Sequence, residues 1–333
     1  MRKLVLFLIV IAAATNISSA SAETGKAGQA GAFLKFGLGA RALGMGGAFC
    51  GIAEGIDAVY YNPAGLAFAA TKQVGFTYHS LSLDRNLNSA AFIFPVRNEA
   101  VMGLSWINSS VSNVTMVDYD RNPFGEFKNS NNAFGLTFAK IFGVKYAFGG
   151  NLRYLQSTLG KLDTYAIGVD IGGYCRLNKT FTIGLAAQDL GSEYRWDSSN
   201  YWSSGGNVYN DKFPIKIRGG TSATLLNEAL TASLDIVKIQ YLDLKIYAGA
   251  EYWIFKQVSI TVPDEESEDE FVEKLINSRL LGLRTGYSDG SLTFGMSLYA
   301  PPFGELSGGF DYAFLTGKRG LESNHILTMR IMF

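Results

Sequence analysis

Apolar residues alternate with small or polar residues along most of the chain, in segments of about ten residues that end in turns. The clearest segment is 181–188, where Phe181, Ile183 and Leu185 share one face. Successive side chains of a β-strand point to opposite faces, so this period predicts strands with one apolar side. The chain is therefore expected to be all-β, with about fourteen strands. They span approximately 73–82, 87–96, 100–109, 131–140, 145–157, 163–175, 179–189, 213–224, 228–239, 242–253, 278–287, 290–299, 304–315 and 323–333.

A soluble sandwich and a transmembrane barrel both show such alternation, but the charges separate them. The polar faces carry isolated charges among small residues, while the opposite faces are aromatic and aliphatic almost without charge. A sandwich would expose far more Lys and Glu, so the pattern predicts a transmembrane, antiparallel, up-and-down β-barrel whose apolar face meets membrane lipid. The residues predicted to face the lumen are Arg153, Asp170, Lys216, Arg218, Asp235, Lys245, Glu251, Arg284, Asp311 and Arg330. Structural pairing is their expected role, and a transport path is the alternative.

The connections between these segments differ in length. Short turns near 97–99, 141–144, 176–178, 225–227 and 300–303 fall on one side, and the longer loops 110–130 and 190–212 on the other. Bacterial barrels show this asymmetry between periplasmic turns and external loops. An acidic insertion at about 263–277 interrupts the regular succession of strands and turns. We expect a solvated loop with a helical turn on the short-turn side, although 256–262 also fits a strand.

Both ends of the chain carry export signals. Arg2 and Lys3 precede an apolar run at 4–14 and an Ala-Ser-Ala site at 20–22, so residues 1–22 are predicted to be a signal peptide. No later apolar stretch is long enough for a transmembrane helix. Alternating apolar residues end the chain in a pattern typical of the signal read by the barrel assembly machinery, at Leu327, Met329, Ile331 and Phe333. These features predict an integral, multi-pass protein of the outer membrane of a Gram-negative-type bacterium.

The segment 23–72, before the predicted barrel at 73–333, is not strand-like. It is rich in Gly and Ala at 37–47 and ends in a Tyr-Tyr-Asn-Pro-Ala-Gly-Leu run at 60–66. Small residues can pack closely against the inner wall of a barrel, so we expect this segment to fill the lumen as a hatch.

The run GARALGMGGAFCGIAEGIDAVYYNPAGLA resembles the N-terminal hatch of FadL-type outer-membrane proteins, particularly the PorV/PorQ branch. Later runs such as FTIGLAAQDLGSEYRW and FPIKIRGGTSATL follow the strand order of that branch. The resemblance implies a fourteen-stranded barrel plugged by the hatch. It also implies that hatch or gate residues are Gly44, Gly46, Gly47, Asn62, Pro63 and Gly65. Asn62 and Pro63 also form a turn sequence, which accounts for them structurally.

Other kinds of chemistry find little support in the sequence. The formal net charge is zero and no basic stretch could neutralise phosphates, which argues against nucleic acid. A Gly-x-Gly-x-x-Ala run at 37–42 lacks the strand and helix of a dinucleotide site, so no cofactor is expected. His79 and His325 have no triad or metal-ligand pattern around them, so neither enzymatic activity nor metal binding is predicted. Cys50 in the hatch and Cys175 facing lipid are not expected to form a disulfide.

Two functions remain open. The resemblance to FadL-type proteins implies passage of a hydrophobic small molecule, such as a fatty-acid-like ligand, across the outer membrane. An apolar lumen patch at Tyr247, Trp253 and Tyr299 is the expected site. The PorV/PorQ resemblance implies instead a component of type IX protein secretion that binds the C-terminal domains of secreted cargo, or other secretion-system components. Its surface would be the aromatic-rich loops 110–130 and 190–212.

Overall fold

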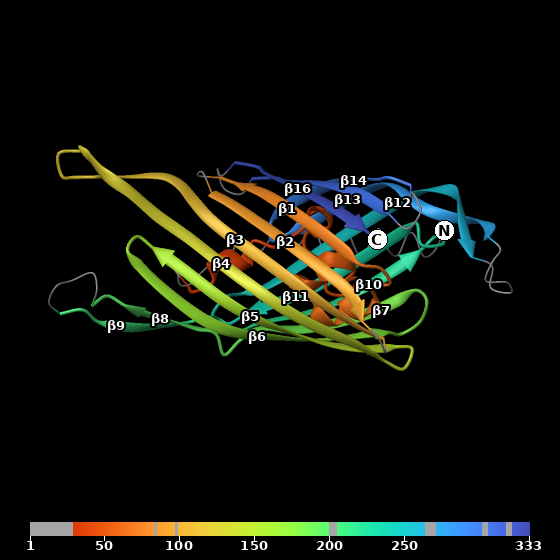
Figure 1. Ribbon diagram of the computed structural model, residues 1–333, viewed down its shortest axis with the longest axis horizontal. Helices are drawn as coiled ribbons and strands as arrows, with labels where there is room; N and C mark the ends of the chain where they lie inside the picture. The colour runs from red at the N-terminus through yellow and green to blue at the C-terminus, as the bar shows by residue number, and fades with distance from the viewer. Residues whose placement is uncertain are drawn as a thin grey trace.

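The computed structural model describes residues 29–82, 85–96, 99–199, 205–263, 271–301, 306–317 and 322–333. The predicted signal peptide lies outside these ranges. Within them, fourteen antiparallel strands form one closed barrel (Figure 1), which confirms the predicted fold class. The barrel closes where the first strand pairs with the last, from Gln73 opposite Met332 to Ser80 opposite His325. The barrel strands are β1 (Gln73–Leu81), β2 (Arg85–Val96), β3 (Ala100–Val117), β4 (Pro123–Phe142), β5 (Tyr146–Leu159), β6 (Leu162–Arg176), β7 (Phe181–Leu190), β10 (Lys216–Leu225), β11 (Leu230–Ile239), β12 (Leu244–Pro263), β13 (Phe271–Ser288), β14 (Ser291–Tyr299), β15 (Ser307–Leu315) and β16 (Asn324–Met332).

The outer surface of this barrel is apolar. On β6, Tyr165, Ile167 and Ile171 are exposed, whereas Ala166 and Asp170 between them are buried inside. Strand β14 repeats the arrangement with an exposed apolar residue at every second position. An apolar band of this kind suits hydrocarbon rather than water. No helix among the described residues is long and apolar enough to cross a membrane.

The region predicted as the long loop 110–130 is instead a continuation of β3 and β4. The two strands stay paired as far as Val117 opposite Pro123, with register shifts on the way. The predicted loop 190–212 contains a second hairpin, made of β8 (Glu193–Asp197) and β9 (Val208–Lys212). Both hairpins project from the same end of the barrel (Figure 1). Beyond the wall the strands no longer alternate between apolar and polar residues, because pairing of their backbones does not require this pattern. The alternation in the sequence therefore did not predict these strand segments.

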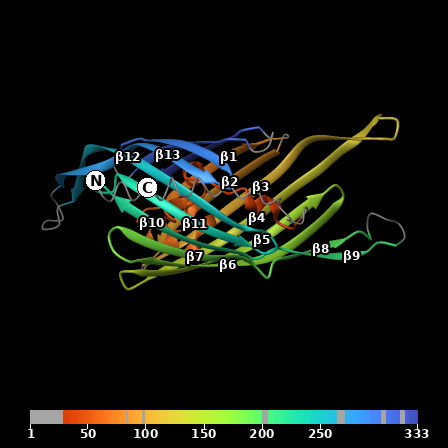
Figure 2. The same ribbon diagram turned by 180° about the vertical axis from the view of Figure 1, so that it is seen from behind.

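The predicted acidic loop also differs from the structure. Strands β12 and β13 run past the wall and remain paired as far as Pro263 opposite Phe271, with an irregularity at Ile254 and Phe255. Residues 256–262 therefore belong to a strand, and 271–277 form its partner rather than a loop with a helical turn. Residues 264–270 lie outside the described ranges. This hairpin projects from the end opposite the β3–β4 hairpin (Figure 2).

The N-terminal segment lies inside the barrel (Figures 1 and 2), and residues 29–72 are called the plug below. Its short helices are η1 (Ala32–Lys35), α2 (Ala40–Gly44), η2 (Gly55–Asp57), α3 (Ala58–Tyr61) and η3 (Pro63–Phe68). Nearly every plug residue from 37 to 67 is buried. The plug backbone can approach the wall this closely because the wall presents glycines to it. A side chain at Gly149, Gly184, Gly249 or Gly286 would collide with the backbone of the plug.

Two neighbouring glycines of the plug allow a matched test of this close contact between plug and wall. Gly46 and Gly47 both have positive φ angles, of 69° and 82°, so an alanine is strained at either. A methyl group on Gly46 would also lie 2.7 Å from the carbonyl oxygen of Ala248 in the wall, whereas one on Gly47 would meet only the Tyr247 ring at 3.8 Å. We expect Gly46→Ala to displace the plug and Gly47→Ala to cost only about 1–2 kcal/mol of backbone strain.

Single-channel conductance in planar bilayers and thermal unfolding of the folded barrel measure the difference. Gly46→Ala should raise the frequency of ion-conducting events and lower the unfolding temperature more than Gly47→Ala. Equal behaviour of the two variants would mean that this contact does not hold the plug.

Candidate functional site

The predicted hatch residues lie where the plug turns or touches the wall. The Asn62 side chain accepts a hydrogen bond from the Ala64 amide at 3.1 Å, which is the expected turn. Its amide nitrogen also donates to the Gly173 carbonyl oxygen of β6 at 3.0 Å, so the same residue fastens the plug to the wall. Pro63 begins η3, and an added side chain at Gly65 would strike Ala53. The Gly44 carbonyl accepts from the Thr293 hydroxyl of β14. These contacts describe the seated plug.

A cluster of ion pairs, called the plug latch, joins the plug to β12 and β13. Arg41 binds both carboxylate oxygens of Glu251, at 2.8 and 2.7 Å, and Arg284 binds Glu251 from the wall side. Glu54 in turn bridges Arg41 and Arg279, each at 2.9 Å. Arg41, Glu251 and Arg284 are buried, so each needs the other charges.

Glu54 is half-exposed, at the edge of the latch. Burial alone would raise the pKa of its carboxyl, but the guanidinium groups of Arg279 and Arg41 outweigh this effect and lower the pKa to about 2. A carboxyl whose pKa is lowered on folding contributes stability above its ordinary pKa and loses it as the pH falls through the folded value. The contribution of Glu54 is therefore complete above a pH of about 4.5 and disappears only toward pH 2.

Two further groups of lumen charges hold the plug. Asp235 accepts the backbone amides of Phe49 and Cys50 at 3.0 and 2.9 Å and pairs with Arg218 at 3.0 Å. On the other side of the latch, Arg330 bridges Asp311 of the wall and Asp57 of the plug. Of the ten residues predicted to face the lumen, all but Lys245 are buried. Lys245 is partly buried and pairs with Asp289, while Lys216 lies over the Tyr60 ring at 4.8 Å.

Sequence reasoning missed the charges on the plug side. Arg41, Glu54 and Asp57 stand in a segment otherwise dominated by small and apolar residues. An isolated charged residue in such a segment indicates that its side chain has a partner of opposite charge, because burial of an unpaired charge would cost much free energy.

The predicted apolar patch at Tyr247, Trp253 and Tyr299 is not a cavity. Trp253 is 1% exposed and packs edge-on against Tyr299, with ring centres 5.1 Å apart. The guanidinium groups of the latch arginines surround its indole at 5.0 to 5.8 Å. Aromatic rings attract cations, and one of the three guanidinium groups here, that of Arg41, belongs to the plug. The prediction of an apolar binding site at these residues is therefore wrong.

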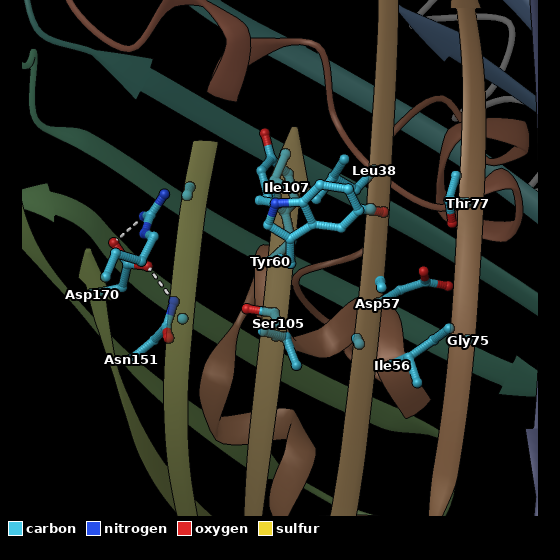
Figure 3. A pocket seen from close by; sticks show the side chains of 18 residues that line it. Leu38, Ile56, Asp57, Tyr60, Gly75, Thr77, Ser105, Ile107, Asn151 and Asp170 are labelled. Carbon is cyan, nitrogen blue, oxygen red and sulfur yellow. Dashed lines mark hydrogen bonds and ion pairs between the residues drawn. The ribbon is translucent and has the colours of Figure 1, made fainter. Parts of the chain in front are cut away.

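A cavity lies instead between the plug and the wall formed by β1 to β6 (Figure 3). Its volume open to a water-sized sphere is about 40 Å³. The plug contributes Leu38, Ile56, Asp57, Val59 and Tyr60 to its lining. The wall contributes mainly small residues, together with Asn151, Arg153 and Asp170 at one end.

Strand register arranges these small residues in a row, called the small-residue belt. Gly75 lies opposite Ala91, Ala91 opposite Ser105, and Ser105 opposite Gly135. The next partner in the row is Arg153 on β5. The small side chains of the belt therefore leave space beside the inner wall, and the row ends at a charged residue.

The other predicted residues lie apart from this cavity. Leu327, Met329, Ile331 and Phe333 are exposed on the last strand and at the C-terminus, and their recognition by assembly machinery stays a prediction. His79 is buried, whereas His325 is exposed and contacts the Tyr312 hydroxyl, so the two rings are on opposite faces of the wall. Cys50 and Cys175 are free thiols.

Solved structures with a similar fold are known, whereas neither a family model nor a curated protein matches the chain. The toluene transporter TbuX of Ralstonia pickettii is 13% identical, with 89% of this chain and 98% of that chain covered and a TM-score of 0.57. The toluene transporter TodX of Pseudomonas putida is 14% identical, covers 89% and 97%, and has a TM-score of 0.55. A FadL homologue of Pseudomonas aeruginosa is 10% identical, covers 87% and 96%, and also scores 0.55. The chain therefore shares the fold of these three proteins.

The latch predicts a large difference between two Glu→Gln variants. Glu251→Gln leaves Arg41 and Arg284 buried beside a neutral amide, and we expect it to destabilise the folded barrel by about 3–5 kcal/mol. Glu54→Gln removes a half-exposed partner and should cost about 1 kcal/mol or less. Urea unfolding in lipid vesicles, followed by tryptophan fluorescence, compares the two. A small effect of both variants would show that the latch does not stabilise the plugged barrel.

Proposed function

We propose that this chain is an outer-membrane barrel of the FadL type that admits a small hydrophobic molecule through the cavity beside the plug. The observation that carries the proposal is the cavity itself, where apolar plug residues face the small-residue belt. An apolar space with a few polar groups at one end is the usual form of a small-molecule site. The exposed apolar band of the wall supports a place in the membrane, and the solved transporters with this fold support the class of cargo.

In this proposal the cavity of the structure is the closed state of the passage. An engineered cavity of roughly 150 Å³ in another protein binds benzene, so about 40 Å³ holds only a few water molecules. An aromatic molecule the size of benzene can enter only when side chains of the plug move away from the wall. Ile56 is well placed to do so, because its side chain rests directly over Gly75 of the belt.

Opening is expected to be local rather than a withdrawal of the whole plug. The ten predicted lumen charges all belong to β5 or later strands, and the plug is ion-paired to two of them, Glu251 and Arg330. The inward residues of the belt on β1 to β4 carry no charge. Movement of the plug away from this part of the wall breaks apolar contacts and the contact of the Arg85 guanidinium with the Phe36 ring, which cost far less than buried ion pairs.

A second candidate function is the binding of a secreted protein, as in the PorV/PorQ branch. The projecting β3–β4 and β8–β9 hairpins favour it, because Tyr119, Phe124 and Tyr209 are strongly exposed on them. Exposed aromatic residues are common at protein interfaces. Co-purification of the cargo C-terminal domain with the intact barrel, and its loss when these three residues are replaced by serine, would support this function. Retention of the cargo by that triple variant would contradict a role for the hairpins.

The proposed passage predicts that filling the cavity blocks binding. Ala91 lines the cavity from the middle of the belt, so Ala91→Leu should reduce toluene binding by at least about tenfold. Ala250→Leu, which places the same side chain on the outer face of β12, is the control and should bind toluene normally. Ligand-detected NMR on protein in lipid nanodiscs measures both, against empty nanodiscs. Unchanged binding in Ala91→Leu would rule out this cavity as the site.

A further inference from the structure

The charges at the end of the cavity formed by β5 and β6 bear on which hydrophobic molecules it accepts. Asp170 and a single cationic residue, Arg153, line this end of the cavity, whereas Asp57 lines the opposite end near Gly75 (Figure 3) and pairs with Arg330. Arg153 is itself shared between two carboxylates, since its Nη2 atom pairs with Asp170 and lies 3.3 Å from Asp189. Lys216 contacts the Tyr60 ring and is not part of the lining. Carboxylates therefore outnumber cations at this end of the cavity.

The hydrogen-bonding capacity of these groups is almost used up. Both oxygens of Asp170 are occupied, one by Arg153 and the Asp189 amide, the other by the Asn151 side chain at 3.0 Å. The Asn151 oxygen accepts from Thr137. The Arg153 Nε–H remains, since it is buried and has no hydrogen-bond partner. A buried donor without a partner is costly, so a ligand that supplies an acceptor there gains affinity.

From this arrangement we infer that the cavity selects uncharged molecules that carry one oxygen acceptor, such as an aromatic alcohol, over the corresponding carboxylates. This inference rests on the proposed function. The apolar body of the molecule lies along the small-residue belt, and its oxygen accepts a hydrogen bond from Arg153 Nε. A carboxylate at the same place lacks a cation of its own, because Arg153 already pairs with Asp170 and Asp189, so it loses its hydration without compensation. The plain hydrocarbon fits the belt but leaves Nε unpaired.

Three ligands with one ring separate these contributions. Toluene, benzyl alcohol and benzoate are titrated into the full-length protein in nanodiscs at a pH of about 7, where the acid is ionised. We expect benzyl alcohol to bind about tenfold more tightly than toluene, and benzoate to bind more weakly than either. The Ala91→Leu protein in the same nanodiscs corrects for partition into lipid. This comparison uses the unaltered chain, so it does not depend on the folding of an Arg153 variant.

Arg153→Lys then tests the assigned donor. Lysine keeps the positive charge between Asp170 and Asp189 but has no Nε–H at the position of the guanidinium, so the preference for benzyl alcohol over toluene should fall to about parity while toluene binding is retained. Arg195→Lys, at an exposed position, is the control and should keep the preference.

The outcomes distinguish this inference from the proposed function. Toluene binding that Ala91→Leu abolishes, combined with benzoate binding as tight as that of the alcohol, would overturn the inference and leave the passage standing. An unchanged alcohol preference in Arg153→Lys would also overturn it. Failure of all three ligands to bind above the Ala91→Leu background would overturn the proposed function and this inference together.

Discussion

Charged side chains buried inside the barrel are stable only when they pair with opposite charges, because they have lost their contact with water. This constraint organises the interior of the molecule. Three charged residues of the wall bind the plug. Glu251 pairs with Arg41, Asp235 accepts hydrogen bonds from two plug amides, and Arg330 pairs with Asp57. Each of these wall charges also has a partner within the wall, so the plug completes ion-pair networks that the wall begins. Plug and wall are therefore one cooperative unit, although they come from separate stretches of the chain.

The same constraint divides the interior into two parts. From β5 onward the wall is charged and holds the plug by ion pairs and by close backbone contact at its glycines. Along the belt on β1 to β4 the wall is small and uncharged, and there the plug leaves a cavity. In the proposed function, stability and passage of the ligand therefore depend on different parts of the circumference, so movement of the plug at the belt need not break the ion pairs of the latch.

Much of the barrel could be predicted from the sequence, because period-two alternation and the segregation of charge to one face are local patterns. The hairpin extensions at 111–117 and 271–277 could not be predicted this way, since backbone pairing beyond the wall leaves little apolar signal. The inward charges were recognised as a set, but their partners were not. Arg41 reaches Glu251 across 210 positions of sequence, and no local pattern reports such a pairing. The same distance explains why Trp253 was mistaken for part of an open site.

The plug touches the wall on many sides. Its backbone lies between glycines on strands as distant as β5 and β13, and Asn62 and Arg41 fasten it to β6 and β12. Because β1 and β16 close the cylinder, removal of the whole plug would break all of these contacts together, so the N-terminal segment acts as an internal brace that ties distant strands to one another.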